Sequence, residues 1–501
     1  MFIEGLSLLA TEPMAIAWII IGTAVGIVFG AVPGLTATMA IAIFLPITYG
    51  LSQVCGLTTI IALYIGGVSG GLISAILLNM PGTPSSVATC FDGRPMALKG
   101  QADKAIGGGI IFSFLGTLFS IAALVFIAPK LAEIAVRFAP HEYFAVTFFS
   151  ISLIITLSSD DLKKGFMAAI LGMMLSCVGL DKVTGVPRYT FDVTAIRSGF
   201  NILTVLVGLY AIREAFDTAE NVNALKDVKS DDVRMRGTGI SLAEFASQGW
   251  NALRSAAIGL VIGILPGIGG GTSNIIAYTV AKNQSKTPEK FGTGILDGVV
   301  ASETANNATI GGAMIPLLTL GIPGDAATAM MLGGLAVHGL SPGPMIFQNY
   351  GPFLYCIFIV MVLCSIAMVV LEFWGLRAFI KVLKVPKNYL LPTIIVLCAV
   401  GAFGLNNRIF DVGATLFFGI IGMVLAKLKF PLPPLILGFI LGNTMESSFR
   451  LALIASRGDY HSFFNRPISG TLIILTILFI VYSLFRIHKK RSSQPAATFT
   501  N

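Results

Sequence analysis

The sequence predicts an all-α, polytopic integral membrane protein built from two inverted structural repeats with broken or re-entrant helices. Two properties of the whole chain predict the membrane class: its 501 residues have a mean hydropathy of +0.85, and only 12% of them are charged. Soluble proteins carry about 25% charged residues. A soluble chain of this length would divide into several domains, each needing a charged surface. A third observation, the recurrence of motifs in both halves, predicts the repeats.

Apolar stretches recur along the chain, several of them near the ~20 residues that a helix needs to cross a bilayer. They are continuous, whereas membrane β-barrel strands alternate over segments of about ten residues. The N-terminal stretch has no basic region and no small-residue cleavage site, so we expect a retained span and not a signal peptide. The predicted spans are residues 15–31, 56–80, 106–128, 144–157, 166–180, 200–212, 352–371, 390–403, 410–425, 434–444 and 469–485.

Charge and cysteine content exclude several classes of protein. The six cysteines are scattered without a C-x-x-C pair, which argues against a disulfide framework or a zinc site. The net charge of +8 comes from bases at span ends and not from a nucleic-acid-binding patch. Bases after the last span predict a cytoplasmic C-terminus; they are Arg486, Lys489, Lys490 and Arg491. No phosphate-binding loop or hydrolase motif occurs, so we expect no enzyme and no cofactor, and an ion gradient as the energy source.

A polar stretch near the middle of the chain separates two halves with matching motifs. "GIVFGAVPG" (26–34) recurs as "GLVIGILPG" (259–267), and the glycine-rich run 70–89 is echoed at 311–330. The predicted organisation is a first membrane repeat (1–212), a polar linker (213–251), a second membrane repeat (252–487) and a cytoplasmic tail (488–501).

Positive charge predicts that the halves are inverted. The loop after Pro81 carries Arg94, Lys99 and Lys104, whereas residues 323–350 contain no Lys or Arg. Because basic loops stay in the cytoplasm, the two equivalent loops are expected on opposite sides of the membrane.

Each half contains two Pro-Gly pairs that interrupt apolar segments: Pro33-Gly34, Pro81-Gly82, Pro266-Gly267 and Pro323-Gly324. A break of this kind frees backbone groups, which are tolerated in a membrane only where protein, water or a ligand satisfies them. Paired breaks in corresponding halves point to a transporter site, where helix N-termini bind anions and free carbonyls hold cations.

The polar and glycine residues around the breaks are therefore the candidate site. The candidates for binding an anionic substrate are Thr36, Thr38, Asn79, Gly82, Thr83, Ser85, Ser86, Gly270, Gly271, Thr272 and Ser273. The candidates for binding a coupling cation, Na⁺ or alternatively H⁺, are Pro33, Gly34, Asn306, Asn307, Gly321, Gly324 and Asp325.

Each assignment has a structural alternative. The glycines of "GIVFG" and "GLVIG" are also typical of close helix packing. Asn306 and Asn307 could cap a helix, and Glu303 could pair with a base or carry a proton. A channel, a membrane enzyme and a scaffold are the alternatives to a transporter; they would need, respectively, a continuous polar lining, clustered ionisable residues and no paired breaks.

Four longer segments resemble one known family. "GAVPGLTATMAIAIFLPIT", "LLNMPGTPSSVATCFDGRPMALKGQADKA", "SETANNATIGGAMIPLLTLGIPGDAATAMMLGG" and "HGLSPGP" resemble the large membrane subunit of tripartite tricarboxylate transporters, the TctA type. The resemblance covers nearly the whole chain. It implies a permease of the bacterial inner membrane that takes up citrate or related carboxylates with a cation gradient. It also implies two partners, a small membrane subunit of about four spans and a periplasmic solute-binding protein.

Overall fold

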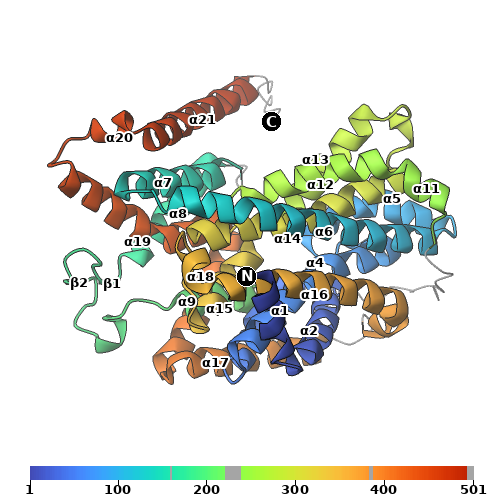
Figure 1. Cartoon of the computed structure of the whole chain (residues 1–501), viewed down its shortest axis with the longest axis horizontal. Coiled ribbons are helices and arrows are strands. Elements are labelled where there is room, and N and C mark those ends of the chain that lie inside the picture. The colour runs from blue at the N-terminus through green and yellow to red at the C-terminus, as the bar shows by residue number, and fades with distance from the viewer. Residues whose placement is uncertain (158–160, 221–238, 383–386, 493–501) are drawn as a thin grey trace, which may run out of the picture. The chain divides into compact units, whose positions relative to one another are not determined.

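A computed structural model describes residues 1–157, 161–220, 239–382 and 387–492 as an assembly of helices (Figure 1). Within these residues the strands are β1 (Gly179–Leu180) and β2 (Pro187–Arg188), paired antiparallel in one loop. Seven of the described helices are long and apolar enough to span a membrane: Met14–Ala31, Gln53–Leu78, Ala102–Ala135, Pro140–Leu157, Ile346–Lys381, Ile409–Lys427 and Pro467–Phe485. The all-α, polytopic membrane fold is thereby confirmed.

The chain divides into two compact units. Unit 1 comprises residues 1–136 and 201–424, and unit 2 comprises residues 137–200 and 425–501. These units are defined by contacts between residues, whereas the predicted repeats are defined by sequence motifs. The boundaries of the repeats therefore stay a prediction. Most of the predicted polar linker, residues 221–238, and most of the predicted tail, residues 493–501, lie outside the described residues.

Unit 1 contains the helices that carry the Pro-Gly breaks. Its first part has α1 (Phe2–Ala10), α2 (Met14–Ala31), α3 (Ala37–Thr48), α4 (Gln53–Leu78), the short helix η1 (Pro84–Ser86), α5 (Val87–Leu98) and α6 (Ala102–Ala135). Its later part has α9 (Ile202–Leu206), the π-helix η3 (Val207–Ile212), α10 (Arg213–Glu220), α11 (Leu242–Ser247), α12 (Gly249–Ile264), α13 (Gly269–Gln284), η5 (Pro288–Lys290), α14 (Leu296–Leu320), α15 (Ala326–Val337), α16 (Ile346–Val382), α17 (Lys387–Asn406) and α18 (Ile409–Lys427).

Helices from the two halves of the sequence make similar contacts in unit 1. α2 packs on α4 and α12 packs on α14, while α6 packs on α14 and α16 packs on α4. α4 and α14 are buried along almost their whole length, as expected for helices that are apolar on every face. These contacts accompany the repeated motifs of the sequence, while the structural repeats and their inverted relation remain predictions.

Glycines let α2 and α12 approach these two central helices at backbone distance. A Cβ atom on Gly30 would lie 3.2 Å from the Cα of Gly70 and closer still to the carbonyl of Gly67. A Cβ atom on Gly263 would lie 2.8 Å from the carbonyl oxygen of Thr309. These upstream glycines therefore serve close helix packing in the fold, as the structural alternative predicts.

Unit 2 contains α7 (Pro140–Leu157), α8 (Leu162–Ser176), η2 (Thr194–Ile196), α19 (Leu432–Ala455), α20 (Ser462–Asn465) and α21 (Pro467–Ser492), together with the loop that bears β1 and β2. α19 packs against α8 and α7, and α21 packs against α7. α21 exposes large apolar side chains, including Leu478, Val481 and Phe485. An exposed apolar face of this kind is expected where lipid is the solvent.

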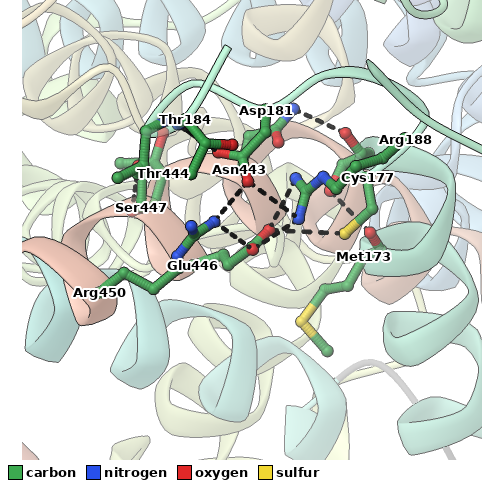
Figure 2. A network of polar contacts seen from close by, with 12 residues as sticks. Met173, Cys177, Asp181, Thr184, Arg188, Asn443, Thr444, Glu446, Ser447 and Arg450 are labelled. Atoms are coloured by element: carbon green, nitrogen blue, oxygen red, sulfur yellow. Dashed lines mark hydrogen bonds and ion pairs between the residues drawn. The ribbon is translucent and has the colours of Figure 1, made fainter. Parts of the chain in front are cut away.

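A network of ion pairs ties the β1–β2 loop to α19 (Figure 2). Arg188 donates to both oxygens of Glu446 at 2.7 and 3.0 Å, and Arg450 donates to Oδ2 of Asp181 at 2.6 Å. Oδ1 of Asp181 accepts from the backbone N–H of Val183 at 2.7 Å. The Arg450 guanidinium and that N–H hold the pKa of Asp181 well below its usual range.

We expect acid to release this loop. Because the pKa of Asp181 is lower in the folded than in the unfolded protein, its stabilising contribution is full above the usual range of an aspartate and is lost as the pH falls through the folded-state value. Hydrogen exchange of residues 179–188, corrected for its intrinsic pH dependence, should show protection at neutral pH that disappears in acid. D181N keeps an oxygen for Val183 but not the charge, so its protection should be weak at every pH. Full protection in D181N would contradict the expectation.

Candidate substrate and cation site

The second break joins α4 to α5 through a tightly packed turn. α4 ends at Asn79, whose φ of +56° is the left-handed conformation that terminates helices, and its side chain is exposed. Gly82 is buried, and a Cβ atom there would meet the carbonyl oxygen of Gly30 on α2. The Ser86 hydroxyl accepts a hydrogen bond from the backbone N–H of Thr83 at 3.3 Å and donates one to the Thr83 carbonyl at 3.0 Å. Both Thr83 and Ser86 are buried and hold the turn that opens α5.

The third and fourth breaks contact each other directly. The backbone N–H of Gly267 donates to the carbonyl of Gly324 at 2.7 Å. A Cβ atom on Gly269 would lie 3.1 Å from the Cβ of Asp325. Gly321 ends α14 with a φ of +70°, in the same left-handed conformation that Asn79 adopts at the end of α4. The two Pro-Gly corners of the later half of unit 1 therefore form one packed site.

The first break has a similar local structure at the start of α3. Gly34 has a φ of +88°, which favours glycine, and Pro33 before it is buried. Thr36 caps α3 by accepting the N–H of Met39 at 3.2 Å, and Thr38 is buried within the first turn. α3 packs against α4 and α15, so this break lies in the same unit as the others.

The residues after the second break lie against those after the third. A Cβ atom on Gly270 would be 2.9 Å from Oγ of Ser85, and one on Gly271 would be 3.2 Å from the carbonyl oxygen of Pro84. Asn274, one turn further along α13, accepts the backbone N–H of Ala88 at 2.8 Å. Of the predicted anion-binding residues, the structure thus brings Ser85 of the first half close to Gly270 and Gly271 of the second.

The remaining residues of this segment differ in exposure. Ser273 is buried and donates to the carbonyl of Gly270 at 3.0 Å, within reach of the Ala305 carbonyl at 3.3 Å. Thr272 is exposed. The two adjacent hydroxyl side chains therefore differ in their access to solvent.

Asn306 and Asn307 lie in the middle of α14, so the alternative that they cap a helix is wrong. α14 runs without interruption from Leu296 to Leu320. The Nδ2 of Asn306 donates to the Val68 carbonyl of α4 at 3.3 Å. The Oδ1 atoms of both asparagines are buried and accept no hydrogen bond from the described residues.

Asp325 is both a helix cap and a link between the halves. Its Oδ1 accepts from the N–H and the hydroxyl of Thr328, each at 2.7 Å, which caps α15. Its Oδ2 accepts from the hydroxyl of Tyr64 on α4, also at 2.7 Å. Tyr64 was not among the predicted site residues; a single tyrosine within the apolar run 56–80 was the only signal for it.

A second cluster of polar side chains lies beside this site. It includes Glu303, for which the sequence allows either pairing with a base or carrying a proton. Glu303 on α14 is fully buried and is bonded by Thr89 of α5 and by Ser113 of α6, the latter at 3.3 Å. The Nδ2 of Asn307 donates to the same Ser113 at 2.8 Å. No three His, Cys, Asp or Glu side chains among the described residues come together as a metal site.

The chain is similar to proteins of Agrobacterium vitis. One, named an uncharacterized 52.8 kDa protein in the TAR-I ttuC' 3' region, is 34% identical over 475 residues, which is 95% of this chain and 94% of the relative. Another, named an uncharacterized protein in the TAR-II ttuC' 3' region, is 36% identical over 226 residues, which is 45% of this chain and 93% of the relative. No solved structure matches.

The family comparison covers most of the chain. Residues 16–437, which include the four Pro-Gly breaks and the Glu303 cluster, match the model of the tripartite tricarboxylate transporter TctA family. The match and the helical membrane fold identify a component of a transporter and not an enzyme. The chain belongs to the tripartite tricarboxylate transporter TctA family.

Proposed function

We propose that this chain is the permease subunit of a binding-protein-dependent secondary transporter for tricarboxylates, such as citrate, or related organic carboxylates. A Na⁺ or H⁺ gradient drives uptake across the bacterial inner membrane, with the C-terminus in the cytoplasm. A small membrane subunit of about four spans and a periplasmic solute-binding protein are its partners. Membership of the family and the paired helix breaks support this proposal.

The observation that carries the site is the contact between the turns that follow the second and third breaks. There the first turn of α13 (Gly269–Gln284) faces Pro84 and Ser85, and the unpaired Oδ1 of Asn306 points at Gly270. The first amides of a helix have no intrahelical partner and carry about half a positive charge. Amides and hydroxyls from both halves would hold the carboxylate groups, without a fixed positive charge in the membrane.

The cation would bind to oxygen atoms of the same region. Asn306 and Asn307 offer unpaired Oδ1 atoms, Asp325 offers a carboxylate, and the chain around Pro33-Gly34 and Gly321–Gly324 offers backbone carbonyls. Oxygen ligands of these kinds suit a hard alkali cation. The closeness of Oδ1 of Asn306 to Gly270 would couple cation binding to substrate binding.

Uptake into vesicles that contain this chain and both partners tests the proposal. Labelled carboxylates would be supplied with Na⁺ and pH gradients imposed separately, using S86A, T272A, N306A and D325A. Each lost hydrogen bond to a charged group costs roughly 1.5–3 kcal/mol, so apparent affinity for substrate or cation should fall about tenfold or more. T279A is the matched control for T272A, because Thr279 is also exposed on α13 and bonds its own helix at the Ile275 carbonyl.

Two results would reject the proposal. Unchanged substrate affinity and ion dependence in all four variants would remove the site. Flux that neither saturates nor follows an imposed gradient would indicate a channel.

A further inference from the structure

Glu303 is a buried acid without a basic partner. It lies in α14 with no exposed surface, and no Lys, Arg or His of the described chain acts on its carboxyl group. The groups that contact the carboxyl are hydroxyls and amides, on Thr89, Ser113 and Asn306. An ionised carboxylate in such surroundings is unfavourable unless a cation accompanies it.

The hydroxyls beside Glu303 form a hydrogen-bonded chain that ends at a backbone carbonyl. Oε1 of Glu303 bonds Oγ1 of Thr89, which lies 3.1 Å from Oγ of Ser302. The Ser302 hydroxyl donates to the backbone carbonyl of Val299 at 3.0 Å. Nδ2 of Asn274 lies 3.5 Å from Oγ1 of Thr89 and is placed to donate to it.

This chain suits both protonation states of Glu303. When the acid is ionised, the Thr89 hydroxyl donates to it. When the acid is protonated, its O–H donates to Thr89, and the Thr89 hydroxyl turns to donate to Ser302, which keeps its bond to Val299. Hydroxyl hydrogens rotate freely enough to make this change. No hydroxyl loses its acceptor in either state.

The other ionisable groups that lie near Glu303 on α5 and α16 are acids. The thiol of Cys90 on α5 and the carboxyl of Glu372 on α16 both interact with it electrostatically, and neither can supply positive charge. Asp92 on α5 is engaged by Tyr278 of α13 at 2.9 Å. On α4, Tyr64 donates to Asp325, and the thiol of Cys55 lies 3.7 Å from a carboxylate oxygen of Glu12.

The basic groups on the elements packed around α14 are occupied or exposed. On α5, Arg94 donates to the Leu77 carbonyl; on α6, Lys104 pairs with Glu244; on α12, Arg254 bonds Gln284 and Asn251. Lys130 on α6 and Lys282 on α13 are exposed.

We propose that Glu303 binds and releases a proton during each transport cycle, so that a pH gradient contributes to uptake. This inference rests on the proposed transport function and names one coupling ion of that site. The proton comes from water on the side where substrate enters, forms the O–H bond at Oε1, and returns to water on the other side as that bond breaks.

The position of Glu303 explains how a proton would be linked to substrate. Thr89 follows the second break, on α5, and Asn274 follows the third break, on α13. The hydroxyl of Thr89 contacts both Glu303 and the side-chain amide of Asn274. Because Glu303 has no exposed surface, water reaches it only when the helices around it move apart. Movement of the substrate-binding segments would then control proton exchange.

E303Q tests the proposal, since it fixes a neutral side chain of the same size. Vesicles with both partners would be given a pH gradient at constant external pH and equal Na⁺, so the ionisation of external substrate is the same for each variant. We expect E303Q to lose accumulation driven by the pH gradient, while it still exchanges labelled for unlabelled carboxylate. Proton uptake measured with the substrate should disappear as well.

Control variants separate this role from a structural one. E133Q removes an exposed carboxyl from the end of α6 and should accumulate substrate like the wild type. T89V removes the hydroxyl link and should weaken the response to the pH gradient, while T89S should restore it. Infrared difference spectra of the purified chain in bilayers should contain a carboxylic-acid band that titrates in the wild type and is absent in E303Q.

The outcomes are distinct. Normal accumulation of E303Q under a pH gradient, or an unchanged infrared band, would overturn the proton role. Wild-type vesicles that show no carboxylate exchange with the binding protein present would refute the proposed function, while the infrared titration would still report on Glu303.

Discussion

Replacing Asp92 with alanine should free the loop between α13 and α14 from α5 and lower stability by about 4 kcal/mol or more. Oδ1 of Asp92 accepts three backbone N–H groups, from Gly292 at 3.0 Å, Gly294 at 2.8 Å and Ile295 at 3.1 Å. Oδ2 accepts from the hydroxyl of Tyr278 at 2.9 Å. Alanine leaves all four donors without this partner, and each partly buried donor left alone costs roughly 1–3 kcal/mol.

Asparagine at the same position is the matched control. D92N keeps an oxygen for the three amides, and its new amide group can donate to the oxygen of Tyr278. Thermal unfolding in detergent should therefore show a large loss for D92A and a small one for D92N. Proteolysis of residues 285–295 should be faster only in D92A. Equal stability of both variants and the wild type would show that the loop is held by other contacts.

The helical membrane class followed from composition and apolar length alone, because lipid tolerates few other backbone arrangements. The Pro-Gly breaks were also readable, since Pro and Gly act on the local backbone. Asn79, by contrast, ends α4 before Pro81 is reached, in a left-handed conformation that the sequence did not indicate. The position at which the chain turns depends on tertiary packing, here the packing of Gly82 against Gly30 and Gly71.

Long-range features were not readable from the sequence. Unit 2 joins residues 137–200 to residues 425–501, and periodicity carries no information on which distant helices pair. The partnership of Tyr64 with Asp325 has the same origin, since 261 residues separate them. The sequence offers helix capping as one alternative for Asn306 and Asn307, because amide side chains are common at helix N-termini. In the fold, α4 and α6 provide partners for their Nδ2 groups across the helix.

Gly30→Ala and Gly263→Ala should each destabilise the fold by about 3 kcal/mol, near the upper end of the usual range for overpacking. The added methyl group would meet rigid backbone in both cases: the Gly67 carbonyl beside Gly30, and the Thr309 carbonyl, at 2.8 Å, beside Gly263. A backbone carbonyl inside a buried helix cannot turn aside as a flexible side chain does. Separation of α2 from α4, or of α12 from α14, would also move the Pro-Gly breaks, so uptake should fall with stability.

Gly413→Ala provides the comparison, because Gly413 is exposed on α18 and a Cβ atom there would meet nothing within 4 Å. Alanine favours helix over glycine by about 1 kcal/mol, so this variant should be as stable as the wild type or more stable. Thermal unfolding and uptake by the three variants decide the question. Gly30 and Gly263 stand 233 residues apart at equivalent places of the repeated motif, so similar losses are expected from the two. A large loss from one and none from the other would show that only one half depends on close backbone contact, and would weaken the case for equivalent repeats.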